Sequence, residues 1–246
     1  MISYFIDPIL RSSTIGSMLM CLASSLIGVL IFVRRRVLIG ETLSHAAYPG
    51  VVLGALISAA FFFEKHDMLI FSIAFIFILL ALFSIEFLES RLKVKSDAAL
   101  CFVLACFFGI GVLLTSSIQR FQGGLVKQVQ LFLYGQAATL RDEHVQIYAF
   151  LVAMVLLILY FTYRTVQVAT FDRNFAKTLG FSLSLFDTLL FCFLAIAILI
   201  GMRTVGVILM SGMLIAPAIS ARQMSRSLLQ MFFWGCKCIF REFFIS

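Results

Sequence analysis

The sequence predicts an all-α, polytopic integral membrane protein with about seven full transmembrane helices and a short or truncated final segment. Of its 246 residues, 62% are hydrophobic and 13% are charged, and the mean hydropathy is +1.09. Soluble domains carry about 45–50% apolar and about 25% charged residues, so the composition excludes a soluble enzyme or a disordered chain. The 28 phenylalanines fit side chains that face lipid. The length fits one membrane domain over residues 1–246, with no room for an added soluble domain.

Seven apolar runs are long enough to cross a bilayer as helices. They cover residues 13–33, 37–63, 68–88, 98–115, 145–163, 188–202 and 204–221. With the N-terminus outside, the inner loops hold 11 Lys and Arg residues and the outer loops hold six. Because cytoplasmic loops carry the basic excess, this orientation is predicted. The basic residues behind the net charge of +7 then lie mostly in loops, where they set the orientation in the bilayer. We therefore expect no nucleic-acid partner.

Residues 131–140 are apolar but too short to cross the bilayer. Gly135 interrupts the run. Short apolar segments broken by glycine can re-enter the membrane and line a pathway. A helix lying on the outer surface fits the same pattern, so both alternatives stay open at the level of sequence.

Residues 171–181, on the inner side, fit a short amphipathic helix. Asp172 can cap its N-terminus, and Gly180 fits the position just after its C-terminus. Phe175 and Leu179 then share one face. Such a helix can dock in a groove on a partner protein, or it can rest on lipid headgroups.

One polar pair lies inside an apolar run. Between Val37 and Phe63 there is no Lys or Arg, yet the run holds Glu41 and His45, whose i, i+4 spacing places both on one helix face. Burying a carboxylate there is costly unless something compensates. A carboxylate oxygen and an imidazole nitrogen suit zinc or manganese, and two ligands are few enough for the ion to leave again. The alternative is that the pair hydrogen-bonds to itself or to a neighbouring helix.

Glycine and proline mark this run and the last predicted span. Pro49 and Gly50 follow the polar pair, where they loosen the helix and permit close packing. In residues 205–221, Gly206 and Pro217 interrupt an otherwise apolar helix, and proline frees a backbone carbonyl. We assign these four residues to packing or to the lining of a pathway.

Three stretches, in this order, resemble the ABC-3 metal permeases, which are the membrane subunits of ABC importers for zinc, manganese and iron. They are RRRVLIGETLSHAAYPGVVLG (34–54), LFLYGQ with FDRNFAKTLGF (131–136 and 171–181), and VGVILMSGMLIAPAISARQ (205–223). The first is quite specific, because Gly-acidic-x-x-Ser-His-x-x-x-Pro-Gly after basic residues resembles the family signature. Together the matches span about residues 13–225 and imply an ABC importer permease-like fold.

The resemblance implies that Glu41 and His45 line the pathway of a divalent metal ion, which is the transported substrate, and that no cofactor is bound permanently. Many members of the family carry aspartate at the Glu41 position, so the preferred metal stays open. The resemblance also implies that residues 171–181 couple the chain to a cytoplasmic ABC ATPase. The residues assigned to this coupling segment are Asp172, Phe175, Ala176, Leu179 and Gly180.

Further partners and a location follow from the same resemblance. An extracytoplasmic metal-binding protein would deliver the ion, and a second permease subunit would complete a homodimer or heterodimer in the lipid of the bacterial inner membrane. The chain itself is not expected to be an enzyme, because ATP hydrolysis belongs to the separate ATPase. In keeping with this expectation, the sequence contains no GxxxxGK[ST] phosphate-binding loop.

The tail, residues 228–246, departs from the family pattern, since members of the family continue through at least one more crossing. It offers only about ten mostly apolar residues before Lys237, too few to span. We therefore expect a truncation or a shifted reading frame. The alternative is an amphipathic tail that Phe240, Phe243 and Phe244 anchor at the interface.

A different transport mechanism fits the same residues. An intramembrane Glu/His pair can act as a proton or cation relay in a secondary transporter or a cation channel. Such a protein would take up its ion without an ATPase and would lose uptake with the proton gradient. The lack of a nucleophile–base set or paired catalytic carboxylates in the spans argues against a membrane-embedded enzyme.

Overall fold

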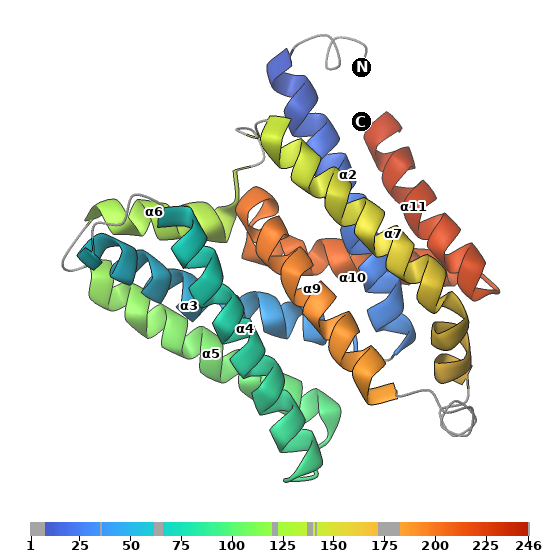
Figure 1. The fold of residues 1–246 in the computed structure, drawn as a ribbon, viewed down its shortest axis with the longest axis horizontal. Coiled ribbons are helices and arrows are strands. Elements are labelled where there is room, and N and C mark those ends of the chain that lie inside the picture. The colour runs from blue at the N-terminus through green and yellow to red at the C-terminus, as the bar shows by residue number, and fades with distance from the viewer. Residues whose placement is uncertain are drawn as a thin grey trace. The chain divides into compact units, whose positions relative to one another are not determined.

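The computed structural model describes residues 8–34, 36–61, 66–119, 123–136, 140, 142–171 and 183–245. In these ranges the chain forms α-helices and no β-strand, which confirms the predicted all-α class (Figure 1). In chain order the helices are α2 (Pro8–Val33), α3 (Ile39–Phe61), α4 (His66–Ser90), α5 (Ser96–Gln119), α6 (Gly123–Tyr134), α7 (Asp142–Phe171), α9 (Leu183–Val205), α10 (Val207–Met224) and α11 (Leu228–Ile245).

Each predicted apolar run falls mainly on one of these helices, although the run 204–221 begins in the last residues of α9 and continues in α10. Among the described residues, four helices are long and apolar enough to cross a membrane by themselves, namely α2, α4, α5 and α7. The helix α3, which carries Glu41 and His45, is not one of the four. Together α9 and α10 pass the same test as a bent pair. The two runs predicted at 188–202 and 204–221 therefore form one broken pair, because the chain bends between them at Gly206.

The chain divides into two compact units. The first unit consists of Met1–Val37, Ala137–Ala197 and Gly212–Ser246, and it contains α2, α7 and α11. The second unit consists of Leu38–Gln136 and Ile198–Ser211, and it contains α3, α4, α5 and α6. Both α9 and α10 contribute to each unit. The polar pair on α3 belongs to the second unit.

In the first unit, α2 packs against both α7 and α11 (Figure 1). Small residues allow its backbone to approach other helices closely. Gly28 of α2 lies directly against the backbone of Leu214 on α10, where a Cβ atom would clash. A Cβ atom at Gly235 of α11 would lie 2.9 Å from Ser25 Oγ of α2. Glycine therefore sets the distance between α2 and two of its neighbours.

The tail predicted at 228–246 is helical and packs on α2 as α11. Its start is capped locally, because the Gln230 N–H donates to Ser227 Oγ at 3.3 Å. The Lys237 Nζ lies 4.6 Å from the centroid of the Trp234 ring, which places a cation–π contact on this helix. The structure describes α11 through Ile245, but it does not describe the side chains predicted to anchor the tail, which are those of Phe240, Phe243 and Phe244.

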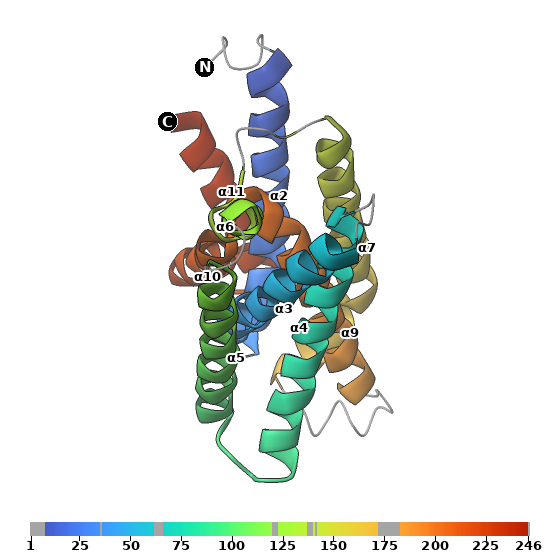
Figure 2. The same ribbon diagram turned by 90° about the vertical axis from the view of Figure 1, so that its left-hand side faces the viewer.

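In the second unit, α3 contacts α4, α5 and α6, and Figure 2 shows it passing between α4 and α5. Two glycines one turn apart bring α3 onto α4. A Cβ atom at Gly50 would lie 2.7 Å from Ala74 Cα, and one at Gly54 would lie 2.8 Å from Ile70 Cα. Since real Cβ atoms do not approach this closely, only glycine permits this spacing between the two helices.

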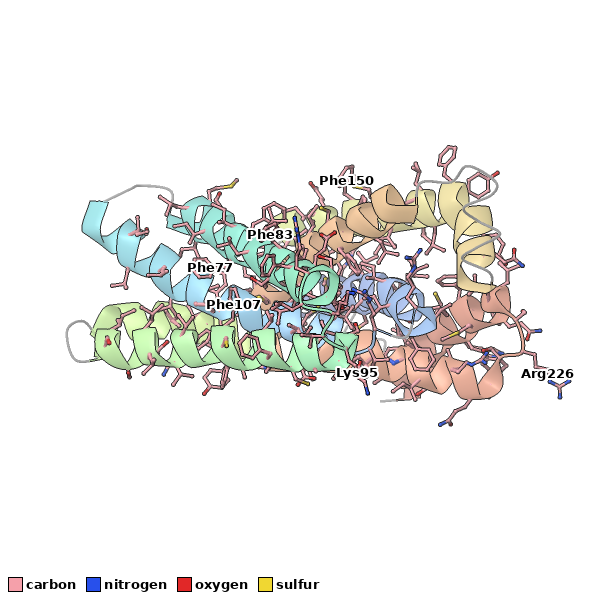
Figure 3. All side chains as sticks on the ribbon, turned by 90° about the horizontal axis from the view of Figure 1, so that it is seen from below. Phe77, Phe83, Lys95, Phe107, Phe150 and Arg226 are labelled. Carbon is pink, nitrogen blue, oxygen red and sulfur yellow. The ribbon has the colours of Figure 1, made fainter. Side chains whose placement is uncertain are left out.

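Aromatic side chains divide between helix contacts and exposed faces. Phe77 of α4 and Phe107 of α5 meet edge to face, with ring centroids 6.3 Å apart (Figure 3). Phe83 of α4 and Phe150 of α7 are 69% and 70% exposed. Exposed phenylalanine on apolar helices agrees with the prediction that the phenylalanine excess faces lipid.

Two glycines with a left-handed backbone meet where apolar helices end. Gly135 (φ +75°) follows α6, and Gly206 (φ +86°) separates α9 from α10. A Cβ atom at Gly206 would clash with the Leu133 carbonyl oxygen, and one at Gly135 would lie 2.5 Å from Gly206 N. The Gln136 N–H donates to the Arg203 carbonyl at 3.2 Å. The end of α6 is therefore joined to the break between α9 and α10 through backbone alone.

The segment predicted at 131–140 is the end of a longer helix. Residues 131–134 form the last turn of α6, which begins at Gly123. The helix ends at Tyr134 because Gly135 takes a left-handed conformation that turns the chain. Residues 137–139 lie outside the described part of the chain.

Gly206→Ala is expected to destabilise the folded protein. The new Cβ would clash with the Leu133 carbonyl, and a φ of +86° is unfavourable for alanine by about 1–2 kcal/mol. Thermal unfolding of the purified protein in detergent, followed by circular dichroism, should show a lower midpoint. Gly212→Ala on α10 is the matched control, because a Cβ atom there meets nothing within 4 Å. Equal midpoints for the two variants would show that the backbone contact imposes no constraint.

Candidate functional site

Glu41 and His45 lie on the first two turns of α3. Because α3 begins at Ile39, Glu41 sits in the first turn, where the helix dipole favours a negative charge. Thr42 fixes this start, since its N–H and its hydroxyl both donate to the Leu38 carbonyl at 2.9 Å. Both members of the pair are half-buried. The structure thus places them on one face of one helix.

Packing holds the His45 ring. The ring stands edge-on to Phe108 of α5, with centroids 5.0 Å apart and planes at 76°. Its Nδ1 is buried and has no hydrogen-bond partner among the described residues. In the same part of the chain, no hydrogen bond or ion pair joins His45 to Glu41. The imidazole and the carboxylate are therefore not satisfied by each other.

The helix α5 contacts the same side of α3 at further points. The Tyr48 and Thr115 hydroxyls share a hydrogen bond of 2.6 Å. The Tyr48 ring lies directly on Gly111, where a Cβ atom would clash with it, and Tyr48 is only 6% exposed. Near the start of α3, the Thr42 hydroxyl also lies 3.4 Å from the Leu100 carbonyl. The polar face of α3 is thus held against α5 on both sides of His45.

The pair offers one carboxylate and one imidazole to a cation. Among the described residues, no group of three or more His, Cys, Asp or Glu side chains comes together. A closed structural metal site uses about four protein ligands. The Glu41–His45 pair alone supplies half of that number.

The remaining predicted residues lie in separate places. Pro49 and Gly50 are buried on α3, and Gly50 faces α4. Gly206 forms the break between α9 and α10, and Pro217 is half-buried inside α10. The predicted coupling residues lie outside the described part of the chain, and they are Asp172, Phe175, Ala176, Leu179 and Gly180.

Three residues around His45 were not singled out from the sequence: Tyr48, Phe108 and Thr115. Tyr48 could have been predicted from the sequence, because it lies three residues after His45 and so falls near it on the same helix. Phe108 is one of 28 phenylalanines, and nothing in its local sequence separates it from those that face lipid. Its contact with His45 depends on how α3 packs against α5, which the sequence does not state.

Comparison with known proteins identifies a matching family. Residues 6–240 match the profile of the ABC 3 transport family. The chain is 37% identical to the manganese transport system membrane protein MntC of Bacillus subtilis, over 88% of this chain and 49% of that protein. It is 33% identical to the zinc transport system membrane protein TroC of Treponema pallidum, over 91% of this chain and 74% of that protein.

A solved structure shares the fold. PsaBC from Streptococcus pneumoniae, in complex with Fab, matches with a TM-score of 0.77 and 26% sequence identity, over 96% of this chain and 82% of that chain. The family match over residues 6–240 includes most of α11, the helix formed by the atypical tail. The chain spans about half the length of several curated relatives that it matches.

Gly111→Ala should disturb the contact between α3 and α5. The new Cβ would push the Tyr48 ring away and strain its hydrogen bond to Thr115, and overpacking of this kind costs about 1–3 kcal/mol. The thermal midpoint in detergent should therefore fall. Gly109→Ala on the same helix is the control, since a Cβ atom there meets nothing within 4 Å and alanine favours a helix. A midpoint for Gly111→Ala as high as that of the control would contradict the packing described.

Proposed function

The chain belongs to the ABC 3 transport family, and we propose that it is the membrane-spanning permease subunit of an ABC importer that moves a divalent transition metal into the cytoplasm. The family match over residues 6–240 carries this proposal. Two relatives are named as manganese and zinc transport proteins, which supports a divalent metal as the substrate. The chemistry of the Glu41–His45 pair agrees with such a substrate.

Glu41 and His45 would bind the ion briefly on its way through the membrane. Zinc accepts imidazole nitrogen and carboxylate oxygen, whereas manganese favours oxygen ligands. Zinc and manganese are therefore the proposed substrates, and iron follows from the family resemblance alone. The ion is cargo, and we propose no permanently bound cofactor. Two side chains from the described part of this chain would hold the ion, which is few enough for it to leave toward the cytoplasm.

A separate cytoplasmic ATPase would drive the transport cycle. ATP binding and hydrolysis on that subunit would open the pathway to each side in turn, and residues 171–181 would transmit the movement. An extracytoplasmic metal-binding protein would deliver the ion. A second permease subunit, identical or paralogous, would complete the pathway in the bacterial plasma membrane. The fold shared with PsaBC supports assembly as part of a transporter.

Uptake of radiolabelled zinc and manganese tests the proposal directly. The host cells should lack their own high-affinity importers, and the ATPase and the binding protein should be supplied or withheld. Uptake that requires the ATPase supports the importer. Uptake that persists without the ATPase and collapses with the proton gradient would instead establish a secondary transporter.

His45→Ala should reduce uptake of both metals to background while membrane insertion is retained. Loss of the imidazole leaves Glu41 as the only member of the pair, and even weaker changes near a metal ligand cost about tenfold or more in affinity. His144→Ala on α7 is the matched histidine control and should retain uptake. Uptake at the wild-type level by His45→Ala would exclude the pair as the metal site.

Lys177→Glu should weaken binding of the ATPase. The substitution reverses a charge within residues 171–181, so it should lower the yield of ATPase that co-purifies with the chain. Lys95→Glu is the matched charge reversal, since Lys95 is exposed in the turn between α4 and α5 and is predicted on the same side of the membrane. If Lys177→Glu co-purifies the ATPase at the wild-type yield, the coupling role of this segment is wrong.

A further inference from the structure

We propose that α5 orients the metal-binding imidazole of His45, with Phe108 as the positioning residue and the Tyr48–Thr115 hydrogen bond holding the two helices in register. The inference rests on the proposed function, because it assigns a role to residues around the proposed metal ligand. None of these three residues is needed to contact the ion. They would act through the orientation of His45.

The first argument is the missing hydrogen bond. A histidine that binds a metal almost always donates its second ring N–H to a carboxylate, a carbonyl or a water, which fixes the orientation of the ring. In the described part of the chain, His45 Nδ1 is buried and no protein group accepts a hydrogen bond from it. Among the described residues, the contact that can fix the ring is its packing against Phe108. Because Nδ1 is buried, Nε2 is the nitrogen left to meet the ion.

The second argument is the geometry of Phe108. Its ring centroid lies 5.0 Å from that of His45 with the planes at 76°, which is the T-shaped arrangement that aromatic pairs prefer. The same ring lies 6.0 Å from the Tyr48 ring at 34°. Phe108 thus contacts two residues of α3 that are three positions apart. Rotation of the His45 ring would have to displace this contact.

The third argument is the register between the helices. Tyr48 and Thr115 share a hydrogen bond of 2.6 Å, and Thr115 Oγ1 also donates to the Gly111 carbonyl at 2.9 Å. With no Cβ on Gly111, the Tyr48 ring lies on the α5 backbone. These contacts stop α3 from sliding along α5, so Phe108 stays opposite His45.

The proposal predicts a difference between metals. Zinc accepts the imidazole nitrogen readily, whereas manganese relies more on oxygen ligands. A loosened His45 ring should therefore weaken the binding of zinc more than the binding of manganese. A general folding defect would lower transport of both metals alike, and it would lower the maximal rate rather than change the ratio of the two KM values.

Phe108→Leu in the full chain, assembled with its ATPase, should raise the KM for zinc uptake about tenfold and the KM for manganese much less. Phe108→Trp keeps an aromatic ring and should stay near the wild type. Phe102→Leu is the matched control, because Phe102 lies on the same helix and is more exposed than Phe108, at 58% against 38%. Unchanged KM values, or an equal rise for both metals, would overturn the positioning role.

A chemical measurement separates this proposal from the proposed function. The sequence has three histidines, so His66→Gln with His144→Gln leaves His45 as the single histidine that diethyl pyrocarbonate can modify. In the purified chain, Phe108→Leu should speed modification of His45, and Phe102→Leu should not. An unchanged rate would refute the positioning role. Faster modification in a chain that transports no metal would support the positioning of His45 and refute the importer.

Discussion

Glycine lets the helix backbones of this protein approach one another closely, and the placement of several helices follows from that contact. Apolar helices in lipid gain little from hydrophobic burial against each other, so packing distance decides how well they associate. Gly50 and Gly54 set the distance from α3 to α4, and Gly28 sets that from α2 to α10. Gly135 and Gly206 join the end of α6 to the break between α9 and α10. Each contact is one that any Cβ atom would disturb.

The candidate site follows from this packing. The glycines of α3 bring one side of the helix onto α4, while its polar side meets α5. Glu41 and His45 are therefore held half-buried on a helix that is fixed on two sides. A polar pair on a loosely packed helix could turn toward water and lose its function. On α3 the pair cannot turn away without breaking contacts along the whole helix.

The sequence predicted the helices and the polar pair, because both are local patterns. Long apolar runs predict membrane-spanning helices without any knowledge of how the helices pack. The placement of an i, i+4 pair on one face follows from the geometry of a single helix. The sequence predicted Gly206 within the span 204–221 and the boundary between the last two spans at Arg203, whereas the structure ends α9 at Val205 and begins α10 at Val207. The contact of Gly206 with Gly135 could not be predicted, because it joins distant parts of the sequence. The role of Phe108 could not be predicted either, because its contact with His45 also joins distant parts of the sequence. The sequence alone does not distinguish a phenylalanine that packs on histidine from one that faces lipid.

Orientation by an aromatic ring suits an ion that must leave. A hydrogen bond that the second ring N–H of a histidine donates to a carboxylate orients the ring, but it also raises the basicity of the ligand and strengthens metal binding. An edge-to-face contact such as that of Phe108 orients the ring without supplying charge. His45 would then meet each ion in a defined geometry with only moderate affinity. A transport site needs this combination, because binding must be selective enough to admit the ion and weak enough to release it.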